Sequence, residues 1–592
     1  YKDWLLKALP IGQTRMISGK VERFRERLQI VHPDYFLPKD EFDRLPPIEP
    51  TYPLTAGLSS KVLTKALIDA LDKLPTNFPE WHDPALYEKN NWQDWHSSLR
   101  QAHRPQADDD LDLNTPHRQR LAYDELLAHQ LALQIARRHR RRQKGRSFVA
   151  QGKLKVQLLE ALPFTLTNAQ TQAIADIEAD MQEPLRMLRL LQGDVGSGKT
   201  MVATVAMLHA VECGAQSAIM APTELLAYQH AQSLAPYFDA LGIKWQLFTS
   251  RNTAKIRAQY MEALANGDID IAIGTHALFQ EDITFKDLGL AVVDEQHRFG
   301  VQQRMELSSK GKGVDILLMT ATPIPRTLAL TSYGDMDISL MTEKPIGRQE
   351  IETKIINLDR YADVVAQLGN LLKRKQRAYW VCPLVHENDE MDLAAAEIRF
   401  KDLSKHYGDA VGLIHGQMKT AEKDKAMAKF QAGEISILVS TTVIEVGVDV
   451  PEASVMIIEH AERFGLAQLH QLRGRVGRGT EKSSCLLLYR APLGQTAQSR
   501  LTMMRQTNDG FLIAEKDLHL RGAGEVLGTR QSGMPLFKLA DIDAHKDLLA
   551  IASDDAKAII QTDPKFESER GQALRHLLFL FKHDRTVRYL RA

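Results

Sequence analysis

Residues 193–200 read Gly193-Asp194-Val195-Gly196-Ser197-Gly198-Lys199-Thr200, and this stretch decides the fold of the chain around it. It follows an apolar run over 187–192 that is typical of a β-strand, and it opens a helical run, which is the context that a P-loop requires. The glycines let the backbone turn tightly and direct its N–H groups at phosphate oxygens, at the positive end of the following helix. The segment therefore predicts a nucleoside triphosphate site, with Lys199 at the β and γ phosphates and Thr200 at a magnesium ion.

An acidic pair supplies the second element of such a site. Asp294-Glu295 follows the apolar run 290–293, about 95 residues after the P-loop. A carboxylate at the end of a strand can meet the metal, and its neighbour can activate water. We assign Asp294 to magnesium and Glu295 to the attacking water. An isolated Asp-Glu pair is usually a surface feature, but the P-loop upstream favours the catalytic interpretation.

Short apolar runs alternate with helical stretches on both sides of this pair. Such alternation predicts a parallel sheet with helices on both of its faces. The predicted strands of a first domain are 187–192, 217–221, 269–273, 288–293 and 315–319. Those of a second domain are 378–382, 411–414, 436–440, 454–458 and 484–488. The fold class is thus α/β, with two tandem parallel-sheet domains over 151–345 and 346–490.

The ends of the chain have other patterns. Residues 1–52 contain β-like runs at 16–18 and 28–31 and predict part of a small β domain, whereas 53–150 is helical and ends in a long helix over 117–146. Residues 491–592 are helical, with a Gly/Arg-rich stretch over 521–533. The basic run Arg137–Arg142 either meets phosphates or forms a solvated helix end.

Composition excludes several classes of protein. No run of about 18 uncharged apolar residues is present, which excludes a membrane-spanning role. The three cysteines form no CxxC pair, so a disulfide scaffold and a cysteine-built zinc site are excluded, and a cytoplasmic setting fits best. Lys plus Arg equals Asp plus Glu at 75 each, so any affinity for nucleic acid must come from local patches. No coiled coil or repeat is evident, and we expect a monomer without metals other than nucleotide-bound magnesium.

With Asp294-Glu295-Gln296-His297, the chain resembles superfamily 2 helicases and translocases, and further segments match that family in order. The resemblance implies two RecA-like motor domains and ATP as the nucleotide. It implies that Phe164 and Gln170, in the segment before the P-loop, recognise the adenine base of the nucleotide. It also implies that Gln296 and His297 belong to the catalytic motif. On the second domain, Gly447 and Asp449 are expected to contribute to the nucleotide site.

Other segments resemble the loops of this superfamily that hold nucleic acid. They are 221–225 and 274–276 on the first domain, with 414–416 and 441–449 as counterparts on the second. Small hydroxyls and main-chain N–H groups are suited to a phosphate backbone. The DNA-binding residues implied in this way are Thr223, Thr275, His276, His415 and Thr442.

The arginine-rich segment Gln471-Leu472-Arg473-Gly474-Arg475-Val476-Gly477-Arg478-Gly479 completes the set. The γ phosphate gains charge in the transition state, and a guanidinium from the facing domain can stabilise it. We assign Arg475 and Arg478 as arginine fingers. Fast hydrolysis would then require closure of the two domains, which links chemistry to movement. The alternative is a structural arginine turn.

Three stretches narrow the resemblance to the RecG family of bacterial ATP-dependent branched-DNA helicases: 294–300, 322–327 and 508–533. The family implies that 491–592 holds a translocation motif, a helical hairpin that transmits motor closure to duplex DNA. Arg500, Arg521 and Gln531 would be its linking network.

The family also implies an oligonucleotide-binding (OB) β barrel, the wedge, before the motor. Here only its later strands are evident, so residues 1–52 are expected to form a partial OB-fold. Phe24, flanked by arginines, would stack an unpaired base at a hairpin tip. A buried core phenylalanine is the alternative.

We therefore expect a bacterial, nucleoid-associated, ATP-driven duplex-DNA translocase that remodels replication forks and Holliday junctions in recombination and repair. Single-strand DNA-binding protein is a candidate partner. One alternative is the motor of a transcription-repair coupling factor, which shares the hairpin. Another is a non-catalytic DNA-binding scaffold, although the complete set of catalytic residues argues against it. An RNA helicase is less favoured, because its family would not carry the hairpin.

Overall fold

The computed structural model describes most of the chain. The described residues are 9–24, 27–31, 33–42, 48–55, 57–76, 78–141, 145–249, 252–280, 282–295, 313–321, 323–325, 329–331, 336–345, 349–383, 389–441, 450, 452–477, 479, 482–526 and 537–583. The chain forms two compact units. The first consists of Tyr1–Ala128, Phe537–Leu548 and Lys565–Phe581, and the second of His129–Leu536, Leu549–Pro564 and Lys582–Ala592.

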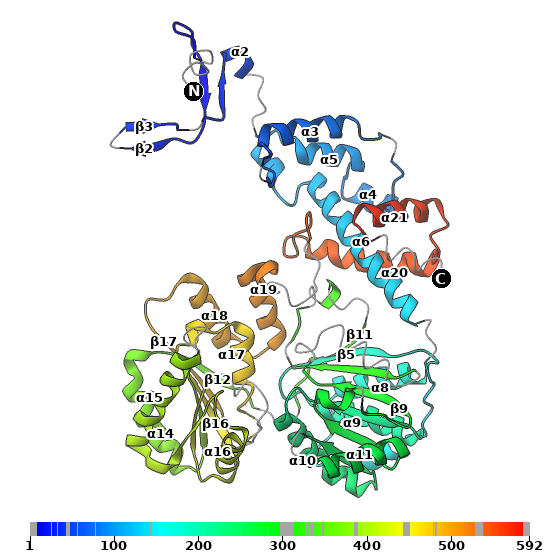
Figure 1. Cartoon of the computed structure of the whole chain (residues 1–592), viewed down its shortest axis with the longest axis vertical. Coiled ribbons are helices and arrows are strands. Elements are labelled where there is room, and N and C mark those ends of the chain that lie inside the picture. Colours follow the sequence, from blue (N-terminus) through cyan, green and yellow to red (C-terminus); the bar gives the residue numbers. More distant parts are fainter. Residues whose placement is uncertain are drawn as a thin grey trace. The chain divides into compact units, whose positions relative to one another are not determined.

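The second unit contains a seven-stranded parallel sheet, of which Figure 1 labels β5, β9 and β11. The order of its strands is β11-β5-β10-β9-β6-β8-β7. Its strands are β5 (Leu188–Gly193), β6 (Gln216–Met220), β7 (Trp245–Phe248), β8 (Ile271–Gly274), β9 (Leu288–Val293), β10 (Asp315–Thr320) and β11 (Asp337–Met341). Its helices include α8 (Asn168–Gln182), α9 (Lys199–Glu212), α10 (Glu224–Ala240) and α11 (Ala254–Asn266). Leu317 and Met319 of β10 pack with α8, α9 and α10, whereas Ile316 and Leu318 lie in a separate core with Leu264 of α11. Both faces of this sheet are therefore buried, as strand periodicity requires.

A second parallel sheet of six strands has the order β12-β17-β16-β13-β15-β14. Its strands are β12 (Glu352–Asn357), β13 (Arg377–Val381), β14 (Val411–Ile414), β15 (Ile437–Ser440), β16 (Ala453–Ile458) and β17 (Ser484–Tyr489). Its helices include α14 (Tyr361–Lys373), α15 (Asp389–Tyr407), α16 (Thr420–Ala432) and α17 (Leu466–Arg473). Tyr379 and Val381 lie in one core and Ala378 and Trp380 in the other. The two tandem parallel-sheet domains predicted from the sequence are confirmed.

Among the described strands of the two parallel sheets, three have no counterpart among the predicted ones: β7, β11 and β12. All three lie at an edge of their sheet. Edge strands are covered less completely, so their sequences need no continuous apolar run. In β11, for example, Ser339 is buried whereas Leu340 is half exposed. The apolar pattern that revealed the central strands is therefore absent from these edges.

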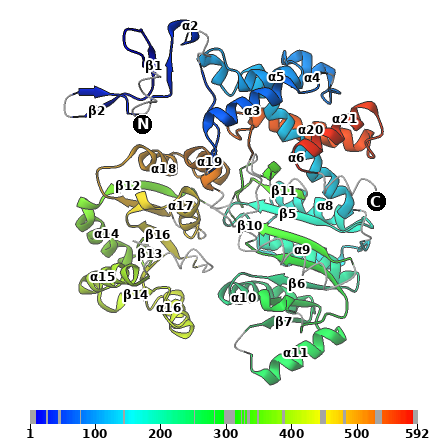
Figure 2. The same cartoon turned by 45° about the horizontal axis from the view of Figure 1, so that its top comes forward.

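The wedge strands lie in the first unit (Figure 2). β1 (Met16–Ser18) pairs antiparallel with β4 (Tyr35–Leu37), and β2 (Glu22–Phe24) pairs antiparallel with β3 (Arg27–Gln29). The last pair before the turn joins Phe24 to Arg27, so the backbone places Phe24 beside the hairpin tip, as predicted. The side chain of Phe24 lies outside the described part of the structure.

The helices of residues 53–150 are α3 (Ser60–Asp72), α4 (Pro84–Lys89), α5 (Trp95–His103) and α6 (Pro116–Arg141). The long helix predicted over 117–146 is described over Pro116–Arg141, and residues 145 and 146 are not helical. Among the described residues that follow the second sheet in sequence, the helices are α18 (Gln495–Gln506), α19 (Gly510–Val526), α20 (Lys546–Thr562) and α21 (Glu569–Leu580). The C-terminal residues divide between the two compact units, with α21 in the first.

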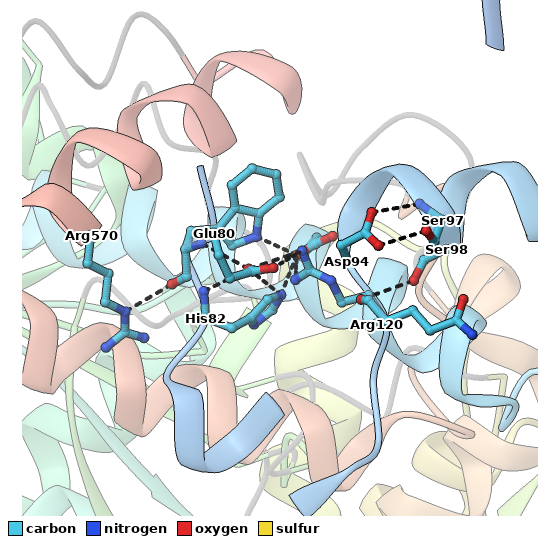
Figure 3. A network of polar contacts seen from close by, with 10 residues as sticks. Glu80, His82, Asp94, Ser97, Ser98, Arg120 and Arg570 are labelled. Atoms are coloured by element: carbon cyan, nitrogen blue, oxygen red, sulfur yellow. Dashed lines mark hydrogen bonds and ion pairs between the residues drawn. The ribbon is translucent and has the colours of Figure 1, made fainter. Parts of the chain in front are cut away.

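A buried polar network centred on Asp124 of α6 holds the first unit together (Figure 3). Its Oδ1 atom accepts hydrogen bonds from Trp81 Nε1 at 2.6 Å, His82 Nε2 at 2.8 Å and Arg120 Nη1 at 2.9 Å. Arg570 of α21 donates to the carbonyl oxygen of Trp81 at 2.9 Å. The network therefore connects α6, the segment before α4 and the C-terminal helix, which are far apart in sequence.

We predict that Arg120→Ala destabilises the first unit by about 3–5 kcal/mol, because it leaves the Asp124 carboxylate buried without its ion-pair partner. Urea denaturation measures the effect. Lys65→Ala, an exposed substitution on α3, is the control and should change the free energy of unfolding by less than about 0.5 kcal/mol. Equal effects of the two substitutions would contradict a stabilising role of the network.

A second buried carboxyl group lies at the start of β10. Asp315 is fully buried, and its Oδ1 atom accepts a hydrogen bond from the Met187 N–H at 2.8 Å. Its Oδ2 atom has no hydrogen-bond partner among the described groups. Burial raises the pKa of Asp315 to about 8. The folded protein therefore holds this carboxyl group mainly in its neutral form at pH 7.

This pKa predicts how stability changes with pH. In the unfolded chain an aspartate has a pKa of about 3.9, so between about pH 4 and pH 8 the folded state binds the extra proton. The contribution of Asp315 to the free energy of unfolding should be fully present below this window. It should fall by up to about 1.4 kcal/mol per pH unit as the pH rises through the window.

Asp315→Asn removes the titration and keeps the shape, so the stability of the variant relative to the wild type should increase from pH 5 to pH 9. Urea denaturation of both proteins at the two pH values measures this difference. A difference that does not change with pH would show that the prediction is wrong.

Candidate active site

The P-loop connects the end of β5 to the start of α9. Gly196 and Gly198 have φ angles of +73° and +86°, in the left-handed region that favours glycine. A Cβ atom on Gly198 would also lie 2.3 Å from Nε2 of Gln170. These two positions therefore require glycine, and they turn the chain into a 14-residue helix whose N-terminus suits phosphate.

Lys199 begins α9 and is 8% exposed. Its Nζ atom donates hydrogen bonds to the carbonyl oxygens of Gly193 at 2.7 Å and Asp194 at 3.0 Å. Thr200 is the next residue of the same helix. The hydroxyl of Ser197 is buried and has no hydrogen-bond partner among the described groups. Together these groups present an ammonium, hydroxyls and main-chain N–H groups, a donor set that fits a polyphosphate.

Asp294 and Glu295 follow β9 directly, as predicted. His230 Nε2 of α10 donates a hydrogen bond to Asp294 Oδ2 at 2.9 Å. Burial raises the pKa of Asp294, but the His230 hydrogen bond and the positive charge of Lys199 lower it, and the net result lies below its ordinary value. The residue is therefore an ionised carboxylate near Lys199, which suits a magnesium ligand.

Glu295 has a φ angle of +52°, which is unusual for a residue with a side chain. Its Oε2 atom accepts a hydrogen bond from the Ala321 N–H at 3.5 Å, just after β10. The local backbone thus turns Glu295 toward the end of the neighbouring strand. Gln296 and His297 lie outside the described residues.

Gln170 and Phe164 precede the P-loop in sequence. Thr167 caps α8, and its N–H donates to Gln170 Oε1 at 2.8 Å. Gln170 Nε2 donates to the Ser197 carbonyl at 2.9 Å, so the amide joins α8 to the P-loop. Phe164 is 49% exposed and lies before this cap. The sequence indicated an adenine-reading role for Gln170 but not its contacts within the protein.

On the second sheet's domain, Arg475 is half buried and lies just after α17. The adjacent Gly474 packs against the P-loop, because a Cβ atom there would lie 2.8 Å from Cβ of Val195. Arg475 therefore belongs to a segment that approaches the nucleotide site. Arg478, Gly447, Asp449 and Thr442 lie outside the part of the chain that the structure describes.

Four of the predicted DNA-binding residues are described, and each follows the carboxyl end of a strand. Thr223 caps α10 after β6, with Oγ1 accepting from the Leu226 N–H at 3.4 Å. Thr275 is buried and His276 is exposed after β8, and His415 is half buried after β14. The carboxyl edge of a parallel sheet is where ligands bind in such folds.

The predicted translocation residues are described only in part. Arg500 of α18 donates to the carbonyl oxygens of Phe464 at 2.7 Å and Glu462 at 3.0 Å, which ties α18 to the segment before α17. Arg521 lies in α19, but its side chain is outside the description, as is all of Gln531. Of the three predicted translocation residues, only Arg500 therefore has contacts among the described residues.

The basic run of α6 has structural partners. Arg137 forms an ion pair with Asp337, and Arg138 donates to the carbonyl oxygen of Pro564 at 2.6 Å. These two guanidinium groups are therefore used within the second unit. The side chains of residues 140–142 are not described.

Sequence reasoning missed two buried histidines of the site. His230 holds Asp294, and His470 of α17 donates to Asp194 Oδ1 at 2.6 Å. Each histidine lies more than 60 residues from its partner in sequence, and no motif spacing connects them. Only the packing of the helices against the strand ends reveals these pairs.

Comparisons with known proteins agree with this geometry. The family described as DEAD/DEAH box helicase matches residues 167–331, and the helicase conserved C-terminal domain matches 362–480. Residues 507–585 match the family described as ATP-dependent DNA helicase RecG, domain 3, C-terminal.

Individual relatives match over most of the chain. The ATP-dependent DNA helicase RecG of Pasteurella multocida is 44% identical over 568 residues, covering 92% of this chain and 80% of the relative. The RecG of Bacillus subtilis is 41% identical, covering 97% of this chain and 83% of the relative. The chain belongs to the RecG family. This RecG family member is therefore an ATP-dependent DNA helicase rather than a non-catalytic scaffold, and the transcription-repair coupling alternative is not favoured.

A solved structure of RecG bound to a three-way DNA junction is 40% identical to this chain. The match covers 93% of this chain and 72% of that one, with a TM-score of 0.66.

Among the described helices, none combines the length and apolar character needed to cross a membrane.

We predict that Lys199→Ala lowers DNA-stimulated ATP hydrolysis about 100-fold or more, because it removes the cation placed for the β and γ phosphates. Release of inorganic phosphate in the presence of DNA measures the rate. Lys255→Ala, an exposed lysine on α11, is the control and should keep the wild-type rate. Wild-type turnover in the Lys199 variant would contradict the assignment of this P-loop.

Proposed function

We propose that this protein uses ATP hydrolysis to translocate on duplex DNA and to remodel branched DNA, including regression of replication forks and branch migration of Holliday junctions. The observation that carries the proposal is the similarity to the RecG bound to a three-way junction, over 93% of the chain. The motor would pull the duplex while the wedge stays at the branch, so that parental strands reanneal.

The nucleotide step is assigned to residues of both motor domains. Main-chain N–H groups of 193–198 would hold the phosphates, with Lys199 at the β and γ phosphates. Thr200 and Asp294 would ligate magnesium, which would neutralise charge that develops on the phosphates. Glu295 would orient the water that attacks the γ phosphate and releases ADP and inorganic phosphate. Arg475, with Arg478, would stabilise the transition-state charge.

Coupling to DNA is assigned to α18, α19 and the turn between them, residues 507–509, which we take as the translocation hairpin implied by the family and call the α18–α19 hairpin. Arg500 supports this proposal, because its hydrogen bonds to Glu462 and Phe464 tie α18 to the segment that leads into α17. A movement of the second motor domain on ATP binding would therefore carry α18 with it. Thr223, Thr275, His276, His415 and Thr442 would hold the phosphate backbone during the step.

The remaining parts of the proposal concern individual residues, domain boundaries and partners, and they rest on what the RecG family implies. Phe24 would stack an unpaired base at the branch, and Arg521 and Gln531 would complete the linking network. We propose the boundaries 1–52, 53–150, 151–345, 346–490 and 491–592 for the functional parts. We also propose action as a monomer at the bacterial nucleoid, with single-strand DNA-binding protein as a partner.

The test compares ATP hydrolysis without DNA, with single strands, with linear duplex and with a three-way fork, followed by gel analysis of the fork. We expect the fork to stimulate hydrolysis most strongly and its strands to be rearranged. Equal stimulation by linear duplex and fork, without rearrangement, would contradict the branched-DNA proposal and leave a duplex translocase. Replacing the fork with a branched RNA of the same sequence is the control for substrate class and should give no stimulation.

A further inference from the structure

A line of hydrogen bonds joins the P-loop to the turn between α18 and α19. His470 Nε2 donates to Asp194 Oδ1 at 2.6 Å, and Arg473 Nη2 donates to His470 Nδ1 at 3.0 Å. Arg473 Nη1 donates in turn to the carbonyl oxygens of Met504 at 2.7 Å and Thr507 at 2.9 Å. These carbonyls belong to the last turn and the C-cap of α18. Three segments that are far apart in sequence are therefore connected through two side chains of α17.

The chemistry of the partners fixes the direction of each hydrogen bond. A guanidinium can only donate, so Nδ1 of His470 must accept from Arg473. The proton of the ring then lies on Nε2, where a carboxylate accepts it. Both histidine and arginine are buried, at 5% and 2% exposure. Burial raises the pKa of Asp194, but the His470 hydrogen bond and the Val195 N–H lower it below its ordinary value, which keeps the acceptor ionised.

Two glycines allow close packing around this line. A Cβ atom on Gly510, the first residue of α19, would lie 2.6 Å from His470 Nε2 and 3.2 Å from Asp194 Cγ. A Cβ atom on Gly474 would lie 2.8 Å from Cβ of Val195. The first residue of α19 therefore rests directly on the hydrogen bond between His470 and Asp194, with no room for a side chain.

Asp194 is also connected to the catalytic lysine. Its main-chain oxygen accepts from Lys199 Nζ at 3.0 Å, while its carboxylate holds His470. On the hairpin side, Asp509 caps α19 by accepting from the Phe511 N–H at 2.8 Å. Lys344, which follows β11, donates to the Asn508 carbonyl at 3.3 Å. The turn is thus held by both motor domains, and a change at Lys199 acts on the residue that holds His470.

We propose that His470 is a positioning residue that couples the P-loop to the α18–α19 hairpin. When Lys199 engages phosphate, its hydrogen bond to Asp194 changes, and His470 and Arg473 transmit the change to the carbonyl groups at the end of α18. This inference rests on the proposed function, in which the hairpin moves duplex DNA. It adds a direct route from the nucleotide site to the hairpin that does not pass through the arginine fingers.

Two substitutions of one residue separate the two halves of the connection. In His470→Asn, the amide oxygen can still accept from Arg473, but the side chain is too short to reach Asp194. In His470→Gln, the amide nitrogen occupies the place of Nε2 and keeps the donor to Asp194. Gln468→Ala is the matched control. It removes the side chain that caps the same helix, but it leaves the hydrogen bonds of His470 and Arg473 in place.

The first measurement is hydrogen–deuterium exchange of residues 504–513, with and without ADP. We expect ADP to change exchange in the wild type and in Gln468→Ala, but not in His470→Asn or His470→Gln, because each of these two variants keeps only one half of the connection. ADP binding, measured separately by fluorescence of a labelled ADP, should persist in all four proteins. An ADP response in His470→Asn equal to that of the wild type would overturn the proposal, as would an equal loss of response in Gln468→Ala.

The second measurement is the amount of junction rearranged per ATP hydrolysed. We expect it to fall about tenfold in His470→Asn, which corresponds to about 1.4 kcal/mol. Gly510→Ala provides a second variant that leaves the histidine in place, and its added methyl group should separate His470 from Asp194 and give the same loss. Wild-type coupling in both variants would overturn the proposal. If the wild type itself rearranged no junction, the proposed function would fail, whereas the exchange experiment would still decide the coupling.

Discussion

Burial of both faces of the central strands is the constraint on which the rest of this structure depends. In β10, the side chains of residues 316–319 enter two different apolar cores in turn, and the one carboxyl group of the strand, Asp315, lies at its start. Polar chemistry is therefore confined to the strand ends, where the backbone leaves the sheet. The P-loop after β5, the acidic pair after β9 and the threonine loops after β6 and β8 all follow from this restriction.

Because the polar groups of the site lie at strand ends, their hydrogen-bond partners come from helices that are distant in the sequence. Asp294 and Asp194 are carboxylates at the edge of an apolar core, and each is held by a histidine from a helix that packs nearby. Hydrogen bonds of this kind lower the pKa of the buried carboxylates and fix their orientation. The opposite case is Asp315, which has no such partner among the described groups and whose pKa rises to about 8. In the first motor domain, a buried carboxylate is thus ionised where the fold supplies a donor and a positive charge.

In the first unit, several donors also surround one buried carboxyl group, but there burial outweighs them and raises the pKa of Asp124 to about 6. Asp124 collects three donors on one oxygen atom and connects α6 to the segment before α4. None of these residues belongs to a recognisable motif, and the sequence predicted only that the region is helical. Arg120 lies one helical turn before Asp124, but Trp81 and His82 lie about 40 residues away, so neither periodicity nor local spacing reveals the whole network. The edge strands β7, β11 and β12 were missed for a related reason, since partial burial leaves no continuous apolar run.

The sequence alone determined the two parallel α/β domains, the P-loop, the acidic pair and the family, because each depends on a local pattern: an apolar run, a glycine at a fixed offset, or a motif in a fixed order. Gly198 is an example, because its positive φ angle favours glycine whatever the surrounding tertiary structure is. Only the tertiary structure decided that Gln170 joins α8 to the P-loop, that His230 holds Asp294, and that His470 and Arg473 connect the P-loop to the end of α18. Those contacts depend on which helix packs over which strand end, and that packing is the sum of many weak apolar contacts that no short segment of sequence encodes.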